Sequence, residues 1–177
     1  MNLRSLFPQA GLSRKREAGR LRLAVSMLSA EEIRSKLEPY SAGQGEILPA
    51  YLFGSAAQGR MNRLSDIDIA LLVDEEKFKE LDIGRPYGYK AAMIAGLMGL
   101  LRMNEIDLVL LHQASPLLAN EVISEGSLLF CRDEDVRIAF EVSVKHRYID
   151  TEPLRPIKRH YLYERIDRDE FSKVRLP

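Results

Sequence analysis

Three runs of apolar residues along the chain have the length and composition of buried strands. They are ILPAYLF at 47–53, DIDIALLV at 66–73 and EIDLVLLH at 105–112. The second and third contain almost no polar alternation after their acids, which is typical of strands covered on both faces of a sheet. A shorter run, SLLFC at 127–131, predicts an edge strand.

Helical patterns lie before and between these strands. Ser29 and Glu32 form a capping box, which predicts the start of a helix. Proline disfavours a helical conformation for the residue before it, so we expect this helix to end just before Pro39. The polar segment SAGQG, residues 41–45, then predicts a loop.

Two further helices are predicted before the edge strand. Residues 85–103 carry the longest apolar pattern of helical period and predict the main core helix, with Pro86 near its first turn. Residues 115–126 begin with Ser115 as N-cap and end with Gly126 past the last turn. Serine and glycine are the preferred residues at those two positions, so a helix of about three turns is predicted there.

The C-terminal part of the chain is predicted to be helical and interrupted once. Residues 133–150 form the first pattern, Pro153 and Pro156 break it, and residues 157–166 form the second. Together with the alternating strands and helices before them, these segments predict a layered α/β or α+β architecture.

Composition excludes several classes of protein. Twenty-six basic and 26 acidic residues give a formal net charge of zero, so no overall field draws the chain to a membrane or to nucleic acid. A single cysteine, Cys131, cannot form an intrachain disulfide, which favours a reducing cytoplasm and a small apolar role for that residue. The longest apolar run, at 91–101, is too short to span a bilayer.

The N-terminal segment is treated separately because its composition cannot build a core. Residues 1–28 include five basic residues between positions 14 and 22. A nucleic-acid-binding arm is one interpretation, but we favour a disordered basic tail, or a start at Met27 in place of Met1. No direct nucleic-acid binding is expected.

Asp66 and Asp68 are the residues of the central strands that indicate a function. Residues two apart in a strand point to the same face, so both carboxylates are aimed at one place. Like charges repel there unless a cation lies between them, and oxygen ligands suit Mg²⁺. Upstream, Gly54 allows close approach to the backbone, and the Ser55 hydroxyl and nearby N–H groups could hold an anion.

A third acid is available on the next long strand. If the strands at 66–73 and 105–112 pair, Asp107 can lie level with Asp66 and Asp68. Glu105 has the same parity and is its rival, and Asp107 is preferred because it lies deeper in the apolar run. A metal site beside a phosphate-binding site is typical of enzymes that act on nucleotides.

Gly54 and Ser55, ten residues and then Asp66-x-Asp68 resemble the signature of the nucleotidyltransferase superfamily that includes DNA polymerase beta. Within it, LFGSAAQGR, SDIDIALLV, EIDLVLL and PLLANEVISEGSLLF resemble the minimal nucleotidyltransferases, the MNT-type antitoxins that partner HEPN toxins. Ala56 and Gln58 depart from a common form of the family's turn. This departure puts in question a phosphate-contacting arginine there, but not the metal site.

The resemblance implies a polymerase beta-like fold, a small mixed sheet flanked by helices, over 29–132, with a C-terminal helical extension at 133–177. It implies transfer of AMP from ATP to a tyrosine of a cognate HEPN toxin, which neutralises the toxin. Asp66 and Asp68 would hold two Mg²⁺ ions, and Asp107 would share the second ion and help to take the proton. Gly54 and Ser55 would hold the β- and γ-phosphates.

Two other functions stay open at this point. The chain could transfer a nucleotide to a small molecule such as an aminoglycoside, or it could bind a toxin without catalysis. The intact acids speak against a pure binder. Arg155 and His160 match the Arg-x4-His core of HEPN ribonucleases, but the tyrosine is misplaced, so an exposed helix face is the preferred interpretation. His112 is predicted to be structural, and His146 to lie on a solvated face.

Overall fold

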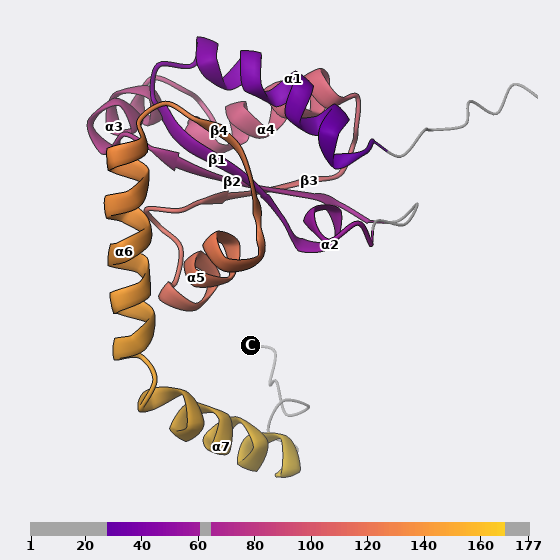
Figure 1. Ribbon diagram of the computed structural model, residues 1–177. Coiled ribbons are helices and arrows are strands. Elements are labelled where there is room, and N and C mark those ends of the chain that lie inside the picture. Colours follow the sequence, from indigo (N-terminus) through magenta and orange to yellow (C-terminus); the bar gives the residue numbers. More distant parts are fainter. Residues whose placement is uncertain (1–27, 61–64, 169–177) are drawn as a thin grey trace, which may run out of the picture.

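A computed structural model describes residues 28–60 and 65–168 of the chain. The predicted basic tail therefore falls almost entirely outside the described residues. A mixed sheet of four strands forms the centre of the molecule, in the order β3-β2-β1-β4 (Figure 1). The strands are β1 (Ile47–Phe53), β2 (Ile67–Val73), β3 (Ile106–Leu110) and β4 (Ser127–Cys131). All four predicted strands are present, and SLLFC is an edge strand as expected.

The described residues form seven helices. They are α1 (Ala30–Gly43), α2 (Gly54–Ala57), α3 (Glu75–Ile83), α4 (Gly88–Leu101), α5 (Pro116–Glu125), α6 (Glu134–Asp150) and α7 (Leu154–Asp167). No helix of residues 28–60 and 65–168 is both long enough and apolar enough to cross a membrane. The predicted α/β class with a small mixed sheet is confirmed.

The alternation of side chains along each strand divides the core into two layers. Ile69 and Leu71 of β2 belong to the layer beneath α1 and α4, together with Leu97 of α4. Ala70 and Leu72 of the same strand pack on the other face, against residues of α5 and α6. Because successive strand residues point to opposite faces, covering both faces requires the unbroken apolar run that β2 has.

The strand directions decide which ends of the strands meet. β1 pairs antiparallel with both β2 and β4, whereas β2 and β3 are parallel. Pro49 lies in the central strand β1, where it cannot donate a ladder hydrogen bond. The register of β1 shifts between Ile47 and Ala50 on the β2 side, which is the irregularity that a proline in a central strand needs.

Helix α1 begins as predicted and ends later than predicted. Ser29 and Glu32 form the capping box, but the helix continues through Pro39 to Gly43, so the predicted end at Pro39 and loop at 41–45 are wrong for Ser41 to Gly43. Pro39 lies on the exposed face of the helix, where the carbonyl that it leaves unpaired can meet water.

A distant arginine supports the extra turn. Nη2 of Arg132 donates to the carbonyls of Ser41, Ala42 and Gln44 at 3.0–3.1 Å, and Nε donates to Ile47 O at 2.9 Å. The last carbonyls of a helix have no partner within it, so these bonds stabilise the end of α1.

Helix α5 follows the prediction closely and α4 differs at its start. The Ser115 hydroxyl accepts from Leu118 N at 3.3 Å, and Gly126 is the C-cap of α5. Helix α4 begins at Gly88, so Pro86 lies in the turn before it. The backbone N–H of Tyr89 donates to the Asp82 carboxylate at 2.6 Å, which satisfies one donor of the first turn.

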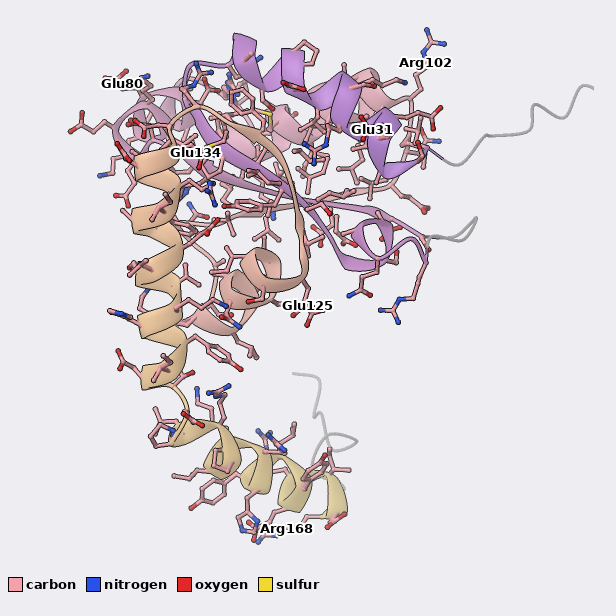
Figure 2. All side chains as sticks on the ribbon, in the orientation of Figure 1. Glu31, Glu80, Arg102, Glu125, Glu134 and Arg168 are labelled. Atoms are coloured by element: carbon pink, nitrogen blue, oxygen red, sulfur yellow. The ribbon has the colours of Figure 1, made fainter. Side chains whose placement is uncertain are left out.

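The two C-terminal helices differ in their contact with the sheet. The Tyr51 hydroxyl on β1 donates to Glu141 of α6 at 2.8 Å, and Val144 of α6 is fully buried. Helix α7 has no buried residue and turns away from the layers after the break at 151–153 (Figures 1 and 2). Pro156 lies inside α7 and Pro153 precedes it as N-cap, so the predicted break is centred on Pro153.

Candidate active site

The first part of the site is the sharp turn between β1 and α2. Gly54 has a left-handed backbone with φ +66°, and a Cβ built on it would lie 2.1 Å from Oδ2 of Asp68. A side chain at position 54 would therefore be strained and would also collide with that carboxylate. The turn is closed by a hydrogen bond from Arg60 N to Ser55 O of 2.9 Å.

The turn and the acid strand are brought together by the antiparallel pairing of β1 with β2. Phe53, the last residue of β1, pairs with Asp68, so the Gly54 backbone begins directly beside the carboxylate. Ser55 follows and is half-buried. Gly54 thus lies against Asp68, and Ser55 is its neighbour in the chain, so three residues that the sequence analysis singled out are close together.

The parallel pairing of β2 with β3 adds the third acid. Asp68 pairs with Asp107, and Ile67 pairs with Ile106. Glu105 precedes β3, and its backbone carbonyl accepts a hydrogen bond from Ile67 N at 3.3 Å. The expected pairing of the two strands is confirmed, and the register places Asp107, not Glu105, beside Asp68.

The acids differ in exposure although they lie at the same edge of the sheet. Asp66 precedes β2 and is exposed, Asp68 is half-buried, and Asp107 is exposed. Burial raises the pKa of Asp68, and the negative charges of Asp107 and Asp66 raise it further. The fold therefore places like charges close enough to Asp68 to oppose its ionisation.

A cation would reverse this repulsion, and the chemistry of the donors fits Mg²⁺, which prefers oxygen ligands and keeps part of its shell for water and phosphate. Within the described part of the chain, however, no three His, Cys, Asp or Glu side chains are gathered tightly enough to hold a metal ion. The three carboxylates thus fit the metal in type, and the strand register places Asp68 beside Asp107. Metal binding would have to draw all three carboxylates together.

One contact near the site was not predictable from the sequence. Nε2 of Gln58, just after α2, donates to Oε2 of Glu125 at the end of α5, at 3.0 Å. Glu125 is labelled in Figure 2. The bond ties the turn that carries Gly54 and Ser55 to a helix on one face of the sheet. The two residues are 67 positions apart, so no local pattern could have revealed it.

The residues that the sequence analysis set aside lie elsewhere. His112 packs edge-on against Phe78 with ring centroids 4.8 Å apart, and burial lowers the pKa of its imidazole. On α7, Arg155 lies over the Tyr148 ring at 4.0 Å, and His160 contacts Glu164 at 3.4 Å.

Cys131 of β4 is half-buried, and burial raises the pKa of its thiol, which disfavours a nucleophilic thiolate.

Comparison with known proteins agrees with this geometry. The family model described as "Polymerase beta, Nucleotidyltransferase" matches residues 35–135. A protein adenylyltransferase MntA from Aphanizomenon flos-aquae is 39% identical over 82 residues, which are 45% of this chain and 53% of that protein. The chain thus spans about half the length of the curated relative that it matches.

Solved structures with a similar fold include toxin–antitoxin complexes. A toxin–antitoxin crystal structure with AMP-PNP contains a chain that is 26% identical, with a TM-score of 0.54 over 73% of this chain and 98% of that one. A variant of the MntA–HpeT toxin–antitoxin also contains a chain 26% identical, with a TM-score of 0.52 over 77% and 99% of the two chains.

Proposed function

The chain belongs to the polymerase beta nucleotidyltransferase family, and from this premise we propose that it is a protein adenylyltransferase antitoxin. It transfers AMP from ATP to a tyrosine hydroxyl of a HEPN-type toxin and thereby neutralises it. The reaction takes place in the cytoplasm and depends on Mg²⁺. The relative from Aphanizomenon flos-aquae is a protein adenylyltransferase, and the two solved relatives are toxin–antitoxin complexes, one of them with an ATP analogue.

The observation that carries the proposal is the register of β2 and β3. Asp107 is paired with Asp68, and Asp68 lies against the Gly54 turn, so two acids from different strands and the turn share one edge. A protein that only binds a toxin gains nothing from two carboxylates that raise the pKa of a third, Asp68. Structural carboxylates are instead normally paired with cations or hydrogen-bond donors.

Gly54 and Ser55 hold the triphosphate in this proposal. The Ser55 hydroxyl donates to a phosphate oxygen, and the missing side chain at Gly54 lets the Asp68 carboxylate lie directly against the turn that holds the phosphates. Gln58 does not contact phosphate but fixes the turn through Glu125. This assignment gives the glutamine a positioning role where a common form of the family's turn has arginine.

Asp66, Asp68 and Asp107 hold the metal in this proposal. Two Mg²⁺ ions supply charge neutralisation at the α-phosphate and at the leaving pyrophosphate when bound. Asp107 takes the proton of the tyrosine hydroxyl as its oxygen forms a bond to the α-phosphorus and the bond to pyrophosphate breaks. A tyrosine hydroxyl has a pKa near 10, so a base at this position is needed near neutral pH.

The direct test is transfer of label from ATP labelled at its α-phosphate to a purified HEPN-type toxin in the presence of Mg²⁺. We expect labelled toxin that has gained the mass of AMP at a tyrosine and has lost its toxicity. The same reaction with a toxin whose exposed tyrosines are changed to phenylalanine is the control. Label that appears on neither protein would contradict the proposal.

A panel of aminoglycosides tests the alternative of a small-molecule acceptor in the same assay. Modified antibiotic together with unlabelled toxin would support that alternative. Neutralisation of the toxin without label, and equally well by the Asp68→Asn variant, would support binding without catalysis. The three outcomes exclude one another for a given pair of proteins.

A further inference from the structure

Helix α4 carries a surface that the proposed reaction does not use. Its sequence, GYKAAMIAGLMGLL, contains one charged residue, Lys90. Tyr89, Met93 and Leu97 are buried against the sheet, and the opposite side exposes Ala91, Ala92, Ala95 and Gly99. A helix that is apolar on every side is normally buried on every side, so the outer face of α4 is unusual for a surface helix.

Two large side chains next to this face are almost fully exposed. Ile83, at the end of α3, is 88% exposed, and Tyr87, just before α4, is 89% exposed. The other exposed large hydrophobic side chains in the described part of the chain reach at most 60%. Keeping two such side chains in water has no benefit for an isolated chain, and patches of this kind mark interaction surfaces.

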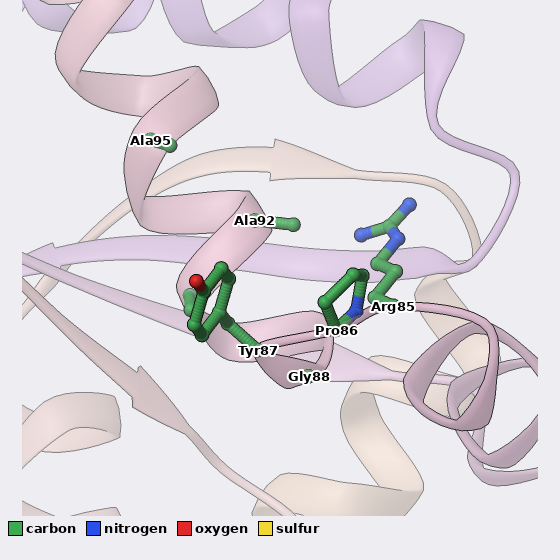
Figure 3. A pocket seen from close by; sticks show the side chains of 7 residues that line it. Arg85, Pro86, Tyr87, Gly88, Ala92 and Ala95 are labelled. Carbon is green, nitrogen blue, oxygen red and sulfur yellow. The ribbon is translucent and has the colours of Figure 1, made fainter.

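The same surface contains a hollow. A cavity of about 350 Å³ at the start of α4 is lined by Arg85, Pro86, Tyr87, Gly88, Ala91, Ala92 and Ala95 (Figure 3). Figure 3 shows Ala92 and Ala95 on the helix, with the Tyr87 ring on one side and Pro86 and Arg85 on the other. The surface therefore carries an exposed aromatic side chain next to a hollow whose lining is apolar except for Arg85.

We propose that this surface, defined by Ile83, Tyr87, Ala91, Ala92 and Ala95, is the contact between two copies of the chain related by a two-fold axis. A two-fold contact uses the same surface on both partners, so it needs a protrusion and a recess on one patch. If the two α4 helices cross antiparallel with Ala91 at the axis, Tyr87 of each copy lies against Ala95 of the other.

The small side chains make this crossing possible. Alanine and glycine let two helix backbones approach more closely than the usual 8–10 Å. A Cβ added at Gly99 would have no neighbour within 4 Å, so the outer side of α4 stays open toward its end. Two charged side chains lie close to this face: Arg85, which lines the hollow and whose guanidinium lies 5.2 Å from the centre of the Tyr89 ring, and Lys90 of α4.

The size of the surface predicts a weak pair. A buried tyrosine contributes about 150–250 Å², and with Ile83 and half of a helix about 21 Å long the patch offers on the order of 500 Å² per copy. Stable complexes bury about 800 Å² per partner, so we expect dissociation at micromolar concentration.

The pairing would leave the acids accessible. α3 and the start of α4 follow the carboxyl end of β2, whereas Asp66 and Asp68 lie at its amino end, about 23 Å away along seven strand residues.

Sedimentation velocity of the full chain between about 1 and 200 μM tests the pairing. We expect a reversible monomer–dimer equilibrium, and at least a tenfold rise in Kd for the double variant Tyr87→Ser with Ile83→Ser. Because both side chains are almost fully exposed, thermal melting should be unchanged. The matched control changes two exposed apolar residues of α6, Ile138→Ser with Val142→Ser, and should leave Kd unchanged.

A cysteine cross-link tests the axis itself. In a Cys131→Ala background, Ala91→Cys should form a disulfide between copies under mild oxidation, because Ala91 faces its own equivalent across the axis. Glu121→Cys, exposed on α5 on the other side of the sheet, should not cross-link. The proposal would be overturned if the chain stays monomeric at 200 μM, or if the α6 variant weakens the dimer and the Tyr87 variant does not. It would also be overturned if Ala91→Cys forms no disulfide between copies.

Discussion

Asp66, Asp68 and Asp107 lie at one edge of the sheet, at the amino ends of β2 and β3, and their like charges repel. Beyond the carboxyl end of β2, Ile83 and Tyr87 expose large apolar side chains beside a hollow that Arg85 also lines. Both regions are unfavourable for the isolated chain, but for different physical reasons. A bound cation and phosphate would offset the repulsion between the carboxylates. Contact with another surface would remove the apolar side chains from water. Changes at one region should therefore leave the function of the other intact.

The largest effect is expected at Asp68. Asp68→Asn removes a charged metal ligand, and charge stabilisation by a metal contributes several kcal/mol, so transfer should fall by at least about a thousandfold. Initial rates of AMP transfer with saturating Mg²⁺ measure this. Asp66→Asn should behave in the same way. A variant that keeps near-normal rates would contradict the metal assignment, and unchanged sedimentation of both variants is the control that separates the two regions.

The next effect concerns the third acid. Asp107→Asn should reduce transfer by about two or more orders of magnitude, the usual contribution of a general base. Binding of ATP with Mg²⁺ should suffer much less, because Asp66 and Asp68 remain. Glu105→Gln, two residues earlier in the chain, is the matched control and should reduce the transfer rate only slightly. If Glu105→Gln is inactive and Asp107→Asn is active, the third acid has been assigned to the wrong residue.

A smaller effect is expected in the turn. Ser55→Ala should weaken binding of a non-hydrolysable ATP analogue by about 1–3 kcal/mol, the cost of losing a hydrogen bond to a charged group. Isothermal titration calorimetry gives this value directly. Ala57→Ser, which changes a neighbouring position by the same hydroxyl, is the control. Equal affinity of the Ser55 variant and the unchanged protein would mean that the turn is only structural.

The stability of the metal-free protein should respond to Asp68 in a direction that depends on pH. The pKa of Asp68 is raised in the folded state, so its contribution to stability is greatest below the unfolded pKa near 4 and is lost as pH rises through the folded pKa. Asp68→Asn should therefore raise the melting temperature relative to the unchanged protein at pH 7 but not at pH 3. Melting curves in chelator at both pH values measure it, and a lower melting temperature of the variant at pH 7 would contradict the repulsion.

No effect on catalysis is expected from the apolar surface. Tyr87→Ser should leave the rate of transfer within about twofold at concentrations where the chain is monomeric, because the change is remote from the acids. A large loss of transfer with unchanged stability would show that the two regions are coupled.

Local patterns were sufficient for most of the elements and for part of the site. The Asp66-x-Asp68 spacing predicts a shared face because strand geometry has a period of two, although Asp66 lies just before β2. Ser29 and Ser115 predict the starts of their helices because capping depends on neighbours three residues away. The assignment of Asp107 over Glu105 needed the pairing of two strands, which follows from packing and not from either strand alone.

The failures of prediction come from contacts that are distant in sequence. Helix α1 continues through Pro39 because Tyr40 and Ser41 pack inward and Arg132 binds the carbonyls at its end. The Gln58–Glu125 bond and the exposed surface of α4 likewise depend on which elements become neighbours. A hydrophobic pattern indicates that a helix will be buried, but it does not say whether its own chain or another one covers each side.

The guanidinium of Arg132 has a consequence for the order of folding. It joins the end of α1 to the residue that follows β4, across 85 to 91 positions of the chain. Contacts at such separation form late because a long loop must close first. During synthesis, the final turn of the first helix therefore gains its partner only after the last strand has left the ribosome. In a nascent chain that ends before Arg132, the last turn of α1 would be frayed. That turn would become stable only when the sheet is complete and Arg132 can bind its carbonyls.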